Sequence, residues 1–122
     1  MSYNNILIVD DSETSRMIIK RCFEMAGYQE STYYQAEDGL KALLHLQKIN
    51  VDLVVTDLKM PKMDGHTFIR KLKVDEKTKR VPILVISSMG NEAIERELKN
   101  EGVMAIIRKP LSPAKVIEAL GE

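Results

Sequence analysis

Residues 51–65 read VDLVVTDLKMPKMDG, an apolar run that ends in an acidic residue and a turn. The apolar residues at positions 51 and 53–55 are bulky and mostly β-branched, which predicts a buried β-strand. Asp57 ends the run, and the proline and glycine that soon follow are typical of a turn. A carboxylate at the end of a buried strand needs an explanation, because charge is costly to bury without a partner.

The same alternation of an apolar strand and a helical segment runs along the whole chain. Strands are expected at residues 5–11, 31–36, 51–57, 81–87 and 103–109. Helices are expected at residues 12–27, 37–48, 64–73, 91–102 and 111–122, with a polar loop at 74–80. Five such β–α pairs predict an α/β fold, in which a parallel sheet has helices on both faces.

Local signals mark the helix ends and their apolar stripes. Asp38 and Ser112 are expected N-caps, with Pro113 in the first helical position and Gly27 at a helix C-terminus. Apolar residues at helical spacing mark stripes on the first two helices: Met17, Ile18, Cys22 and Met25, then Leu40, Leu43, Leu44 and Leu46.

Composition excludes several classes of protein. With 122 residues, 44% of them hydrophobic, we expect one domain over residues 1–122, with a core and no output domain. Eighteen basic residues balance eighteen acidic ones, which argues against nonspecific nucleic-acid or membrane binding. No apolar run approaches the ~18 residues of a membrane span, and no signal peptide is evident. Cys22 is the only cysteine, so neither a disulfide nor a zinc cluster of cysteine and histidine is expected within the chain; the expected setting is the cytoplasm.

Polar residues end four of the five expected strands: Asp10 and Asp11, Asp57, Ser87 and Ser88, and Lys109 before Pro110. The carboxyl ends of parallel strands share one edge, where such sheets bind ligands. Two carboxylates about 4 Å apart repel by roughly 4 kcal/mol at an effective dielectric constant near 20, and one lysine does not neutralise three of them. A hard divalent ion such as Mg²⁺ would, and a tetrahedral dianion could then bind beside it. The pattern indicates phosphoryl transfer.

Each of these residues also has a purely structural interpretation. The alternatives are helix capping by Asp10–Asp11 and by Ser87–Ser88, turn formation by Asp57, and simple solvation of Lys109. Met60 and Met63 are expected to pack, and Asp64–Gly65 to begin a helix. The joint arrival of these residues at strand ends favours a functional site.

The motifs together resemble the receiver domain of two-component response regulators, over essentially the whole chain. They are ILIVDDS, AEDGLKAL, DLVVTDLKMPKMDG, PILVISS and IRKP. In length the chain is similar to the single-domain chemotaxis type. The resemblance implies a flavodoxin-like, doubly wound fold with strand order 2-1-3-4-5.

The resemblance also implies chemical roles. Asp57 would be the phosphoacceptor, attacking the phosphohistidine of a sensor histidine kinase to give an acyl phosphate. Mg²⁺ would be bound by Asp11, by Asp10 mainly through water, by Asp57, and by the backbone carbonyl of Lys59.

The comparison with the family pattern extends to further positions. Lys109, with a cis bond before Pro110, would contact the phosphoryl oxygens, and Ser87 would be the switch hydroxyl. Ile106 departs from the family, which often has Tyr or Phe there, so an aromatic-gated switch is not implied. Lys59 and Met89 occupy positions that in the family tune the phosphoryl lifetime.

The expected function is that of a stand-alone, monomeric response regulator that catalyses only its own phosphorylation and dephosphorylation. It would act on a downstream target protein through the fourth helix, fifth strand and fifth helix, residues 91–120. Alternatives are a phosphorelay intermediate, a receiver that is never phosphorylated, a metal-dependent phosphatase and a flavodoxin-like mononucleotide binder. The phosphatase is disfavoured because DDSET lacks the D-x-D-x-T spacing, and the nucleotide binder because Asp10 and Asp11 would repel a phosphate.

Overall fold

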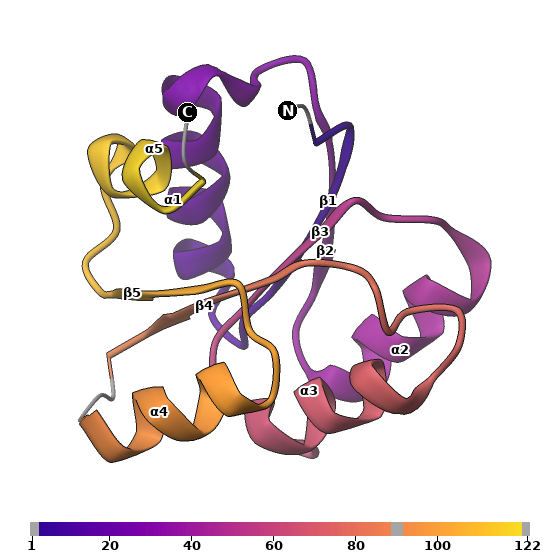
Figure 1. The fold of residues 1–122 in the computed structure, drawn as a ribbon. Helices are drawn as coiled ribbons and strands as arrows, with labels where there is room; N and C mark the ends of the chain where they lie inside the picture. The colour runs from indigo at the N-terminus through magenta and orange to yellow at the C-terminus, as the bar shows by residue number, and fades with distance from the viewer. Residues whose placement is uncertain (1–2, 89–91, 121–122) are drawn as a thin grey trace.

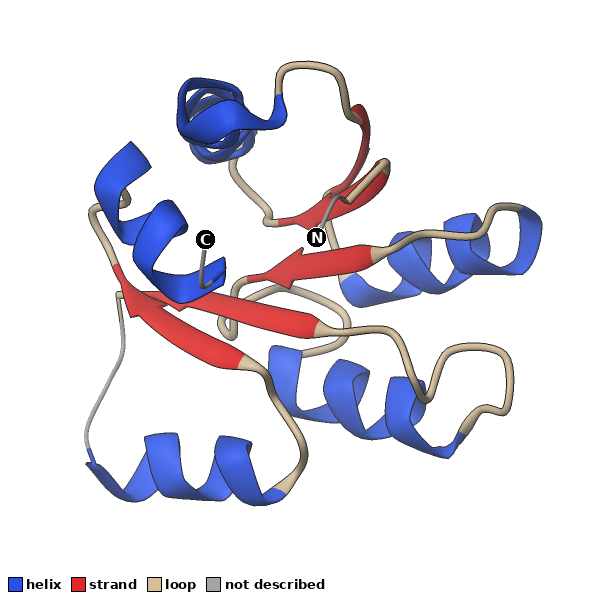
Figure 2. Cartoon of the chain, turned by 45° about the horizontal axis from the view of Figure 1, so that its top comes forward, coloured by secondary structure: helices blue, strands red, loops and turns tan. Residues whose placement is uncertain are grey.

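Strands and helices alternate along residues 3–88 and 92–120, the part of the chain that the computed structural model describes (Figure 2). The strands are β1 (Asn5–Val9), β2 (Thr32–Ala36), β3 (Leu53–Thr56), β4 (Ile83–Ser87) and β5 (Ala105–Arg108). The helices are α1 (Glu13–Phe23), α2 (Gly39–Lys48), α3 (Gly65–Val74), α4 (Glu92–Asn100) and α5 (Pro113–Leu120). Each expected element is present, mostly with shorter bounds. The expectations for Met89, Asn91, Gly121 and Glu122 lie outside the described residues.

All five strands form one parallel sheet in the order β2-β1-β3-β4-β5, which confirms the order that the resemblance implied. The order reverses at β1, because β2 lies on one side of it and β3 on the other. Val9 of β1 is in register with Thr56 of β3, so Asp10 and Asp57 leave the sheet side by side.

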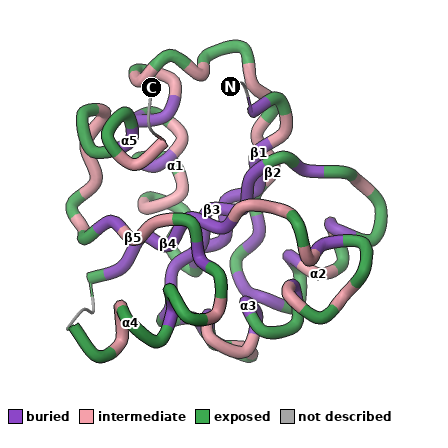
Figure 3. Tube along the Cα trace, viewed as in Figure 1, coloured by how far each residue is buried: buried purple, intermediate pink, exposed green. Residues whose placement is uncertain are grey.

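Helices cover both faces of the sheet (Figure 1). On one side α1 and α5 pack on the sheet, and on the other α2, α3 and α4. Side chains alternate along β1 accordingly: Leu7 and Val9 belong to the core under α2, α3 and α4, and Ile6 and Ile8 to the core under α1 and α5. The three central strands β1, β3 and β4 are therefore almost wholly buried (Figure 3), which explains why their sequences are nearly continuous apolar runs. The edge strands β2 and β5 are partly exposed.

Side-chain caps begin the helices where the sequence predicted them. Asp38 and Asp64 accept hydrogen bonds from backbone amides in the first turns of α2 and α3, and Ser112 does so in α5. In α1 the cap is Ser12, which accepts from the backbone N–H of Ser15. The alternative that Asp10–Asp11 caps this helix is therefore wrong.

The apolar faces of the first two helices were partly misassigned. Met17, Ile18 and Met25, and likewise Leu40 and Leu44, are exposed. The prediction is confirmed for Cys22 and Leu46, which are buried. The buried face of α1 also includes Ile19 and Phe23, and that of α2 Gly39 and Ala42. Both helices carry apolar residues on more than one face, so their spacing did not determine which face packs on the sheet.

The first helix also ends earlier than expected. A π-type turn follows α1 over Glu24–Tyr28, and within it Gly27 has a φ of 111°. That left-handed conformation strongly favours glycine and is common at helix ends, which agrees with the role predicted for Gly27.

Candidate functional site

The ends of β1 and β3 bring three carboxylates together. The Asp57 backbone N–H donates to the Val9 carbonyl at 3.0 Å, and that of Asp10 to the Ala36 carbonyl at 3.1 Å. One oxygen from each of Asp10, Asp11 and Asp57 lies within 4.8 Å of the others. Asp10 is 1% exposed and Asp57 7%, whereas Asp11 is open to solvent. The sheet thus fixes two buried carboxylates, and the carboxylate of Asp11 lies beside them at the solvent-exposed surface.

Lys109 reaches this group from the end of β5. Its Nζ donates to Asp10 Oδ2 and to Asp57 Oδ2, both at 3.1 Å. Its backbone N–H donates to the Ser87 carbonyl at 3.0 Å, and its bond to Pro110 is cis. The alternative that Lys109 is simply solvated is therefore wrong.

The ammonium of Lys109 is stabilised in its charged form. Burial by itself disfavours that charge, but the hydrogen bonds and negative charges of Asp57 and Asp10 outweigh it. The pKa of Lys109 therefore lies above its ordinary value, and the cation persists at neutral pH.

Asp57 also organises the turn that follows it. Its Oδ1 accepts from the backbone N–H of Leu58 at 2.6 Å and, at 3.4 Å, from that of Lys59. The turn closes on α3, where the Gly65 N–H donates to the Leu58 carbonyl at 2.7 Å. A Cβ at Gly65 would lie 2.6 Å from the Asp57 carbonyl oxygen, so the approach requires glycine. The turn-forming interpretation of Asp57 is thus correct, and the same side chain also faces Lys109.

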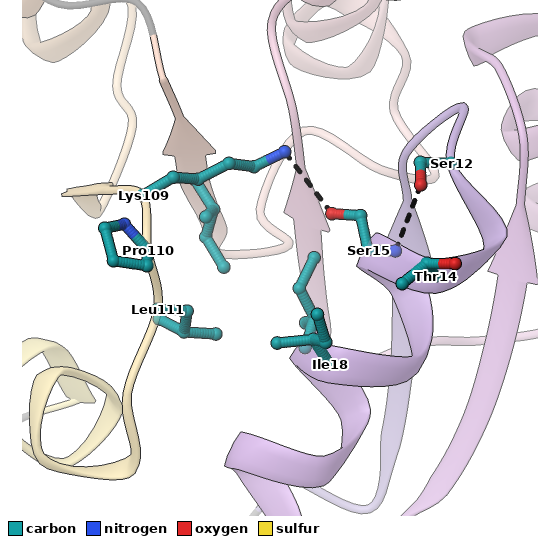
Figure 4. Close-up of a pocket in the computed structure, with 9 residues that line it drawn as sticks. Ser12, Thr14, Ser15, Ile18, Lys109, Pro110 and Leu111 are labelled. Atoms are coloured by element: carbon teal, nitrogen blue, oxygen red, sulfur yellow. Dashed lines mark hydrogen bonds between the residues drawn. The ribbon is translucent and has the colours of Figure 1, made fainter.

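Ser15 is a member of this group that the sequence analysis did not assign to it. Its hydroxyl donates to Asp10 Oδ2 at 2.7 Å. The same hydroxyl accepts from Lys109 Nζ at 3.3 Å (Figure 4). Asp10 Oδ1 in turn accepts from the Ser12 N–H at 3.0 Å. A hydroxyl in the first turn of the helix after Asp10–Asp11 was the available signal, because that turn must pass over the strand end.

The remaining predicted residues lie near the same edge. Ser87 is buried at the end of β4, and Ser88 after it is exposed. The expected capping of the fourth helix by these serines involves residues 89–91, which lie outside the described residues. Ile106 is half-buried on β5 and packs against the core under α2, α3 and α4.

A pocket of 460 Å³ opens beside Lys109, between α1 and the segment that joins β5 to α5 (Figure 4). Its walls are mostly apolar, including Ile18, Ile86 and Leu111, and Ser15 and Lys109 form its polar end. The carboxylate group therefore lies next to a surface that can receive an apolar side chain.

The family model for the response regulator receiver domain matches residues 6–121. The chain belongs to this family. CheY-3, a chemotaxis protein of Vibrio cholerae, is 37% identical over 115 residues, which are 94% of this chain and 87% of that protein. The chemotaxis protein CheY of Thermotoga maritima is 35% identical over 118 residues, 96% of this chain and 94% of that protein.

Solved structures agree with this assignment. The chemotaxis response regulator CheY4 of Vibrio cholerae matches with a TM-score of 0.84 and 28% identity, covering 98% of this chain and 97% of that one. The chain is thus a receiver domain homologous to single-domain response regulators. None of the helices in its described part has the length and apolar character that crossing a membrane requires.

Proposed function

We propose that the chain is a stand-alone response regulator whose phosphoacceptor is Asp57. One observation carries the assignment: Asp57 and Asp10 share the Lys109 ammonium at 3.1 Å, with Asp11 in the same group, at the carboxyl edge of a receiver-family sheet. Parallel sheets of this kind bind their ligands at that edge, next to the strand where the order reverses.

In the proposed reaction a carboxylate oxygen of Asp57 attacks the phosphorus of a phosphohistidine on a sensor histidine kinase. A phosphorus–oxygen bond forms, the phosphorus–nitrogen bond breaks, and the histidine nitrogen leaves with the electron pair. Asp57 is held by strand β3 and by two backbone amides, which supports a nucleophile fixed before the reaction begins. Lys109 would move its hydrogen bond from Asp57 Oδ2 to the incoming phosphoryl oxygens.

The donor set fits Mg²⁺. Three carboxylates oppose one ammonium, and every donor is an oxygen, which suits a hard divalent ion. Asp11, Asp57 and the Lys59 carbonyl would hold the ion directly. Asp10 would act mainly through water, as the family resemblance implies. Bound Mg²⁺ would neutralise charge on the carboxylates and the phosphoryl group.

The phosphorylated state would be read by another protein. Ser87 would supply the switch hydroxyl, and Ile106 would take part in the switch without the polar edge of an aromatic ring. The α4–β5–α5 face would bind the target, and it contains a groove of 480 Å³ whose lining includes Ile106, Lys99 and Arg108. The protein would act as a cytoplasmic monomer and catalyse only its own phosphorylation and dephosphorylation.

The test uses acetyl phosphate as a small phosphodonor. Intact-mass measurement should show one added phosphoryl group in the presence of Mg²⁺ and none with a chelator. Asp57→Asn should abolish the addition, and Asp75→Asn, which changes a carboxylate far from this edge, should leave it unchanged. Equal labelling of the Asp57→Asn protein would show that the phosphoacceptor is another residue.

A further inference from the structure

A second group of metal-ligating side chains lies away from the aspartates, between α3 and α4. His66 is in the first turn of α3, Glu97 is on α4, and Glu101 follows the end of α4. One ligand atom of each lies within 4.8 Å of the others. Within residues 3–88 and 92–120, this group and the three aspartates are the two such groups.

Two atoms of this group are buried without a hydrogen-bond partner. They are His66 Nδ1 and Glu101 Oε1, and no other buried side-chain nitrogen or oxygen of the described residues is in that state. His66 Nδ1 lies 3.5 Å from Glu97 Oε1 without forming a hydrogen bond to it. Buried polar atoms are rarely left unpaired, and both of these belong to one group of metal-ligating side chains. The His66 and Glu101 side chains themselves are 27% and 20% exposed.

Arg70 supplies only part of the charge that the group needs. Its Nε donates to Glu101 Oε2 at 3.0 Å, and its Nη2 lies 3.6 Å from Glu97 Oε1. One guanidinium against two carboxylates leaves one negative charge. Arg70 therefore holds Glu101 by Oε2 and leaves Oε1 available to a metal ion. Carboxylates that bind metals are commonly held by such a second hydrogen bond.

We propose that His66, Glu97 and Glu101 bind Zn²⁺ or a similar divalent transition metal. An imidazole nitrogen with two carboxylates suits zinc, whereas the all-oxygen aspartate group suits Mg²⁺. Tetrahedral zinc places neighbouring ligand atoms roughly 3.4 Å apart, given metal–ligand bonds of about 2.1 Å. The 3.5 Å between His66 and Glu97 already matches that spacing. Glu97 is half-exposed and free to adjust, and a water would fill the fourth position.

Zinc bound at this site would link α4 to the first turn of α3, which is hydrogen-bonded to the turn that follows Asp57. His66 follows Gly65, whose N–H is bonded to the Leu58 carbonyl of that turn. Glu97 lies on the helix of the proposed target-binding face. If the proposed function holds, phosphorylation of Asp57 would change the affinity of the protein for zinc. By linkage, bound zinc would change the equilibrium population of the phosphorylated state by the same factor. Zinc binding itself does not depend on that function.

The test is a titration of ZnCl₂ into the tag-free full chain in the presence of saturating Mg²⁺. Calorimetry measures the binding, and amide NMR spectra locate it. We expect one zinc ion to bind, with shifts around residue 66 and residues 97–101. His66→Gln and Glu101→Gln should each weaken binding about tenfold or more. The matched control is His45→Gln, which changes the other of the two histidines in the chain and should bind zinc like the wild type.

Three outcomes would overturn the zinc site. They are no zinc binding, equal binding by wild type and both variants, and shifts centred on Asp10, Asp11 and Asp57 instead. Amide NMR spectra of each variant without metal verify that it is folded, and two variants on different elements guard against a local defect. Asp57→Asn should bind zinc normally, so failure of phosphorylation and failure of the zinc site are distinguishable.

Discussion

Arg108 and Lys109 are neighbours at the end of β5, and each pairs with a carboxylate at almost the same distance. Lys109 Nζ lies 3.1 Å from both Asp10 and Asp57, and Arg108 Nη2 lies 3.2 Å from Glu95. Their surroundings differ. The Arg108 side chain is 62% exposed, whereas the Lys109 side chain is 26% exposed and the side chains of its partners Asp10 and Asp57 only 1% and 9%.

The difference shows that distance alone does not determine what an ion pair contributes. Around Arg108 and Glu95, water and salt screen the charges, and exposed pairs of this kind contribute about 0–1 kcal/mol. Around Lys109 the lower dielectric strengthens each interaction, and strands hold the carboxylates in place. The pairs of Lys109 with Asp10 and Asp57 can therefore hold charges in a fixed geometry, whereas Arg108 and Glu95 form an ordinary surface ion pair.

The largest effect should come from Lys109→Met. Without the ammonium, charge on the transferring phosphoryl group loses a fixed partner, and loss of one such donor lowers reaction rates about 100-fold or more. Phosphoryl incorporation from acetyl phosphate, followed by mass against time, measures the rate. The same variant should bind Mg²⁺ more tightly, because Lys109 no longer competes for Asp57 Oδ2.

Arg108→Met is the matched control for that experiment. It removes a cation one residue away and should leave the phosphorylation rate within about twofold of wild type, because the Arg108 side chain is exposed and pairs with Glu95, away from the aspartates. Similar losses in the two variants would mean that the general positive charge of β5, and not the position of Lys109, governs the reaction.

An intermediate effect is expected from Gly65→Ala, which tests how rigid the turn after Asp57 is. The added methyl group would lie 2.6 Å from both the Asp57 carbonyl oxygen and Leu58 Cα, which are main-chain atoms with little freedom to move. The free energy of unfolding should fall by about 1–3 kcal/mol, as measured by urea denaturation.

Gly39→Ala provides the contrast for that change. Its methyl group would meet the Met63 side chain at 3.0 Å or more, and methionine adapts readily. With the higher helix propensity of alanine, the net change should be within about 1 kcal/mol of zero. If Gly65→Ala costs no more than Gly39→Ala, the turn after Asp57 is softer than the main-chain contacts imply.

The smallest effect concerns the exposed pair itself. A double-mutant cycle with Arg108→Met and Glu95→Gln should give a coupling free energy of about 0.2–1 kcal/mol that declines at high salt. Denaturation at low and high ionic strength measures it. A coupling free energy of several kcal/mol that does not change with salt would show that Arg108 and Glu95 are as poorly screened as Lys109 and its aspartates.

The sequence alone determined the order of elements and which polar residues end the strands at the sheet edge. Apolar runs that stop at Asp10, Asp57 and Lys109 predict both the strands and the place where their polar ends meet, because parallel strands share one carboxyl edge. Caps such as Asp38 and Ser112 were predictable for a similar reason, since they depend on residues only a few positions away. The strand order required the family resemblance in addition.

Only the tertiary structure decided which helix faces pack and which polar residues outside the predicted strand ends come together. Met17 and Ile18 are as apolar as Ile19, and only the fit of α1 against the sheet buries Ile19 and leaves the other two in solvent. The hydrogen bonds of Ser15 to Asp10 and Lys109 depend on how closely α1 approaches β5. His66, Glu97 and Glu101 likewise come together only because α3 and α4 cover the same face of the sheet. Such contacts join residues far apart in the chain, and their distances are set by the packing of whole elements, which local sequence patterns do not encode.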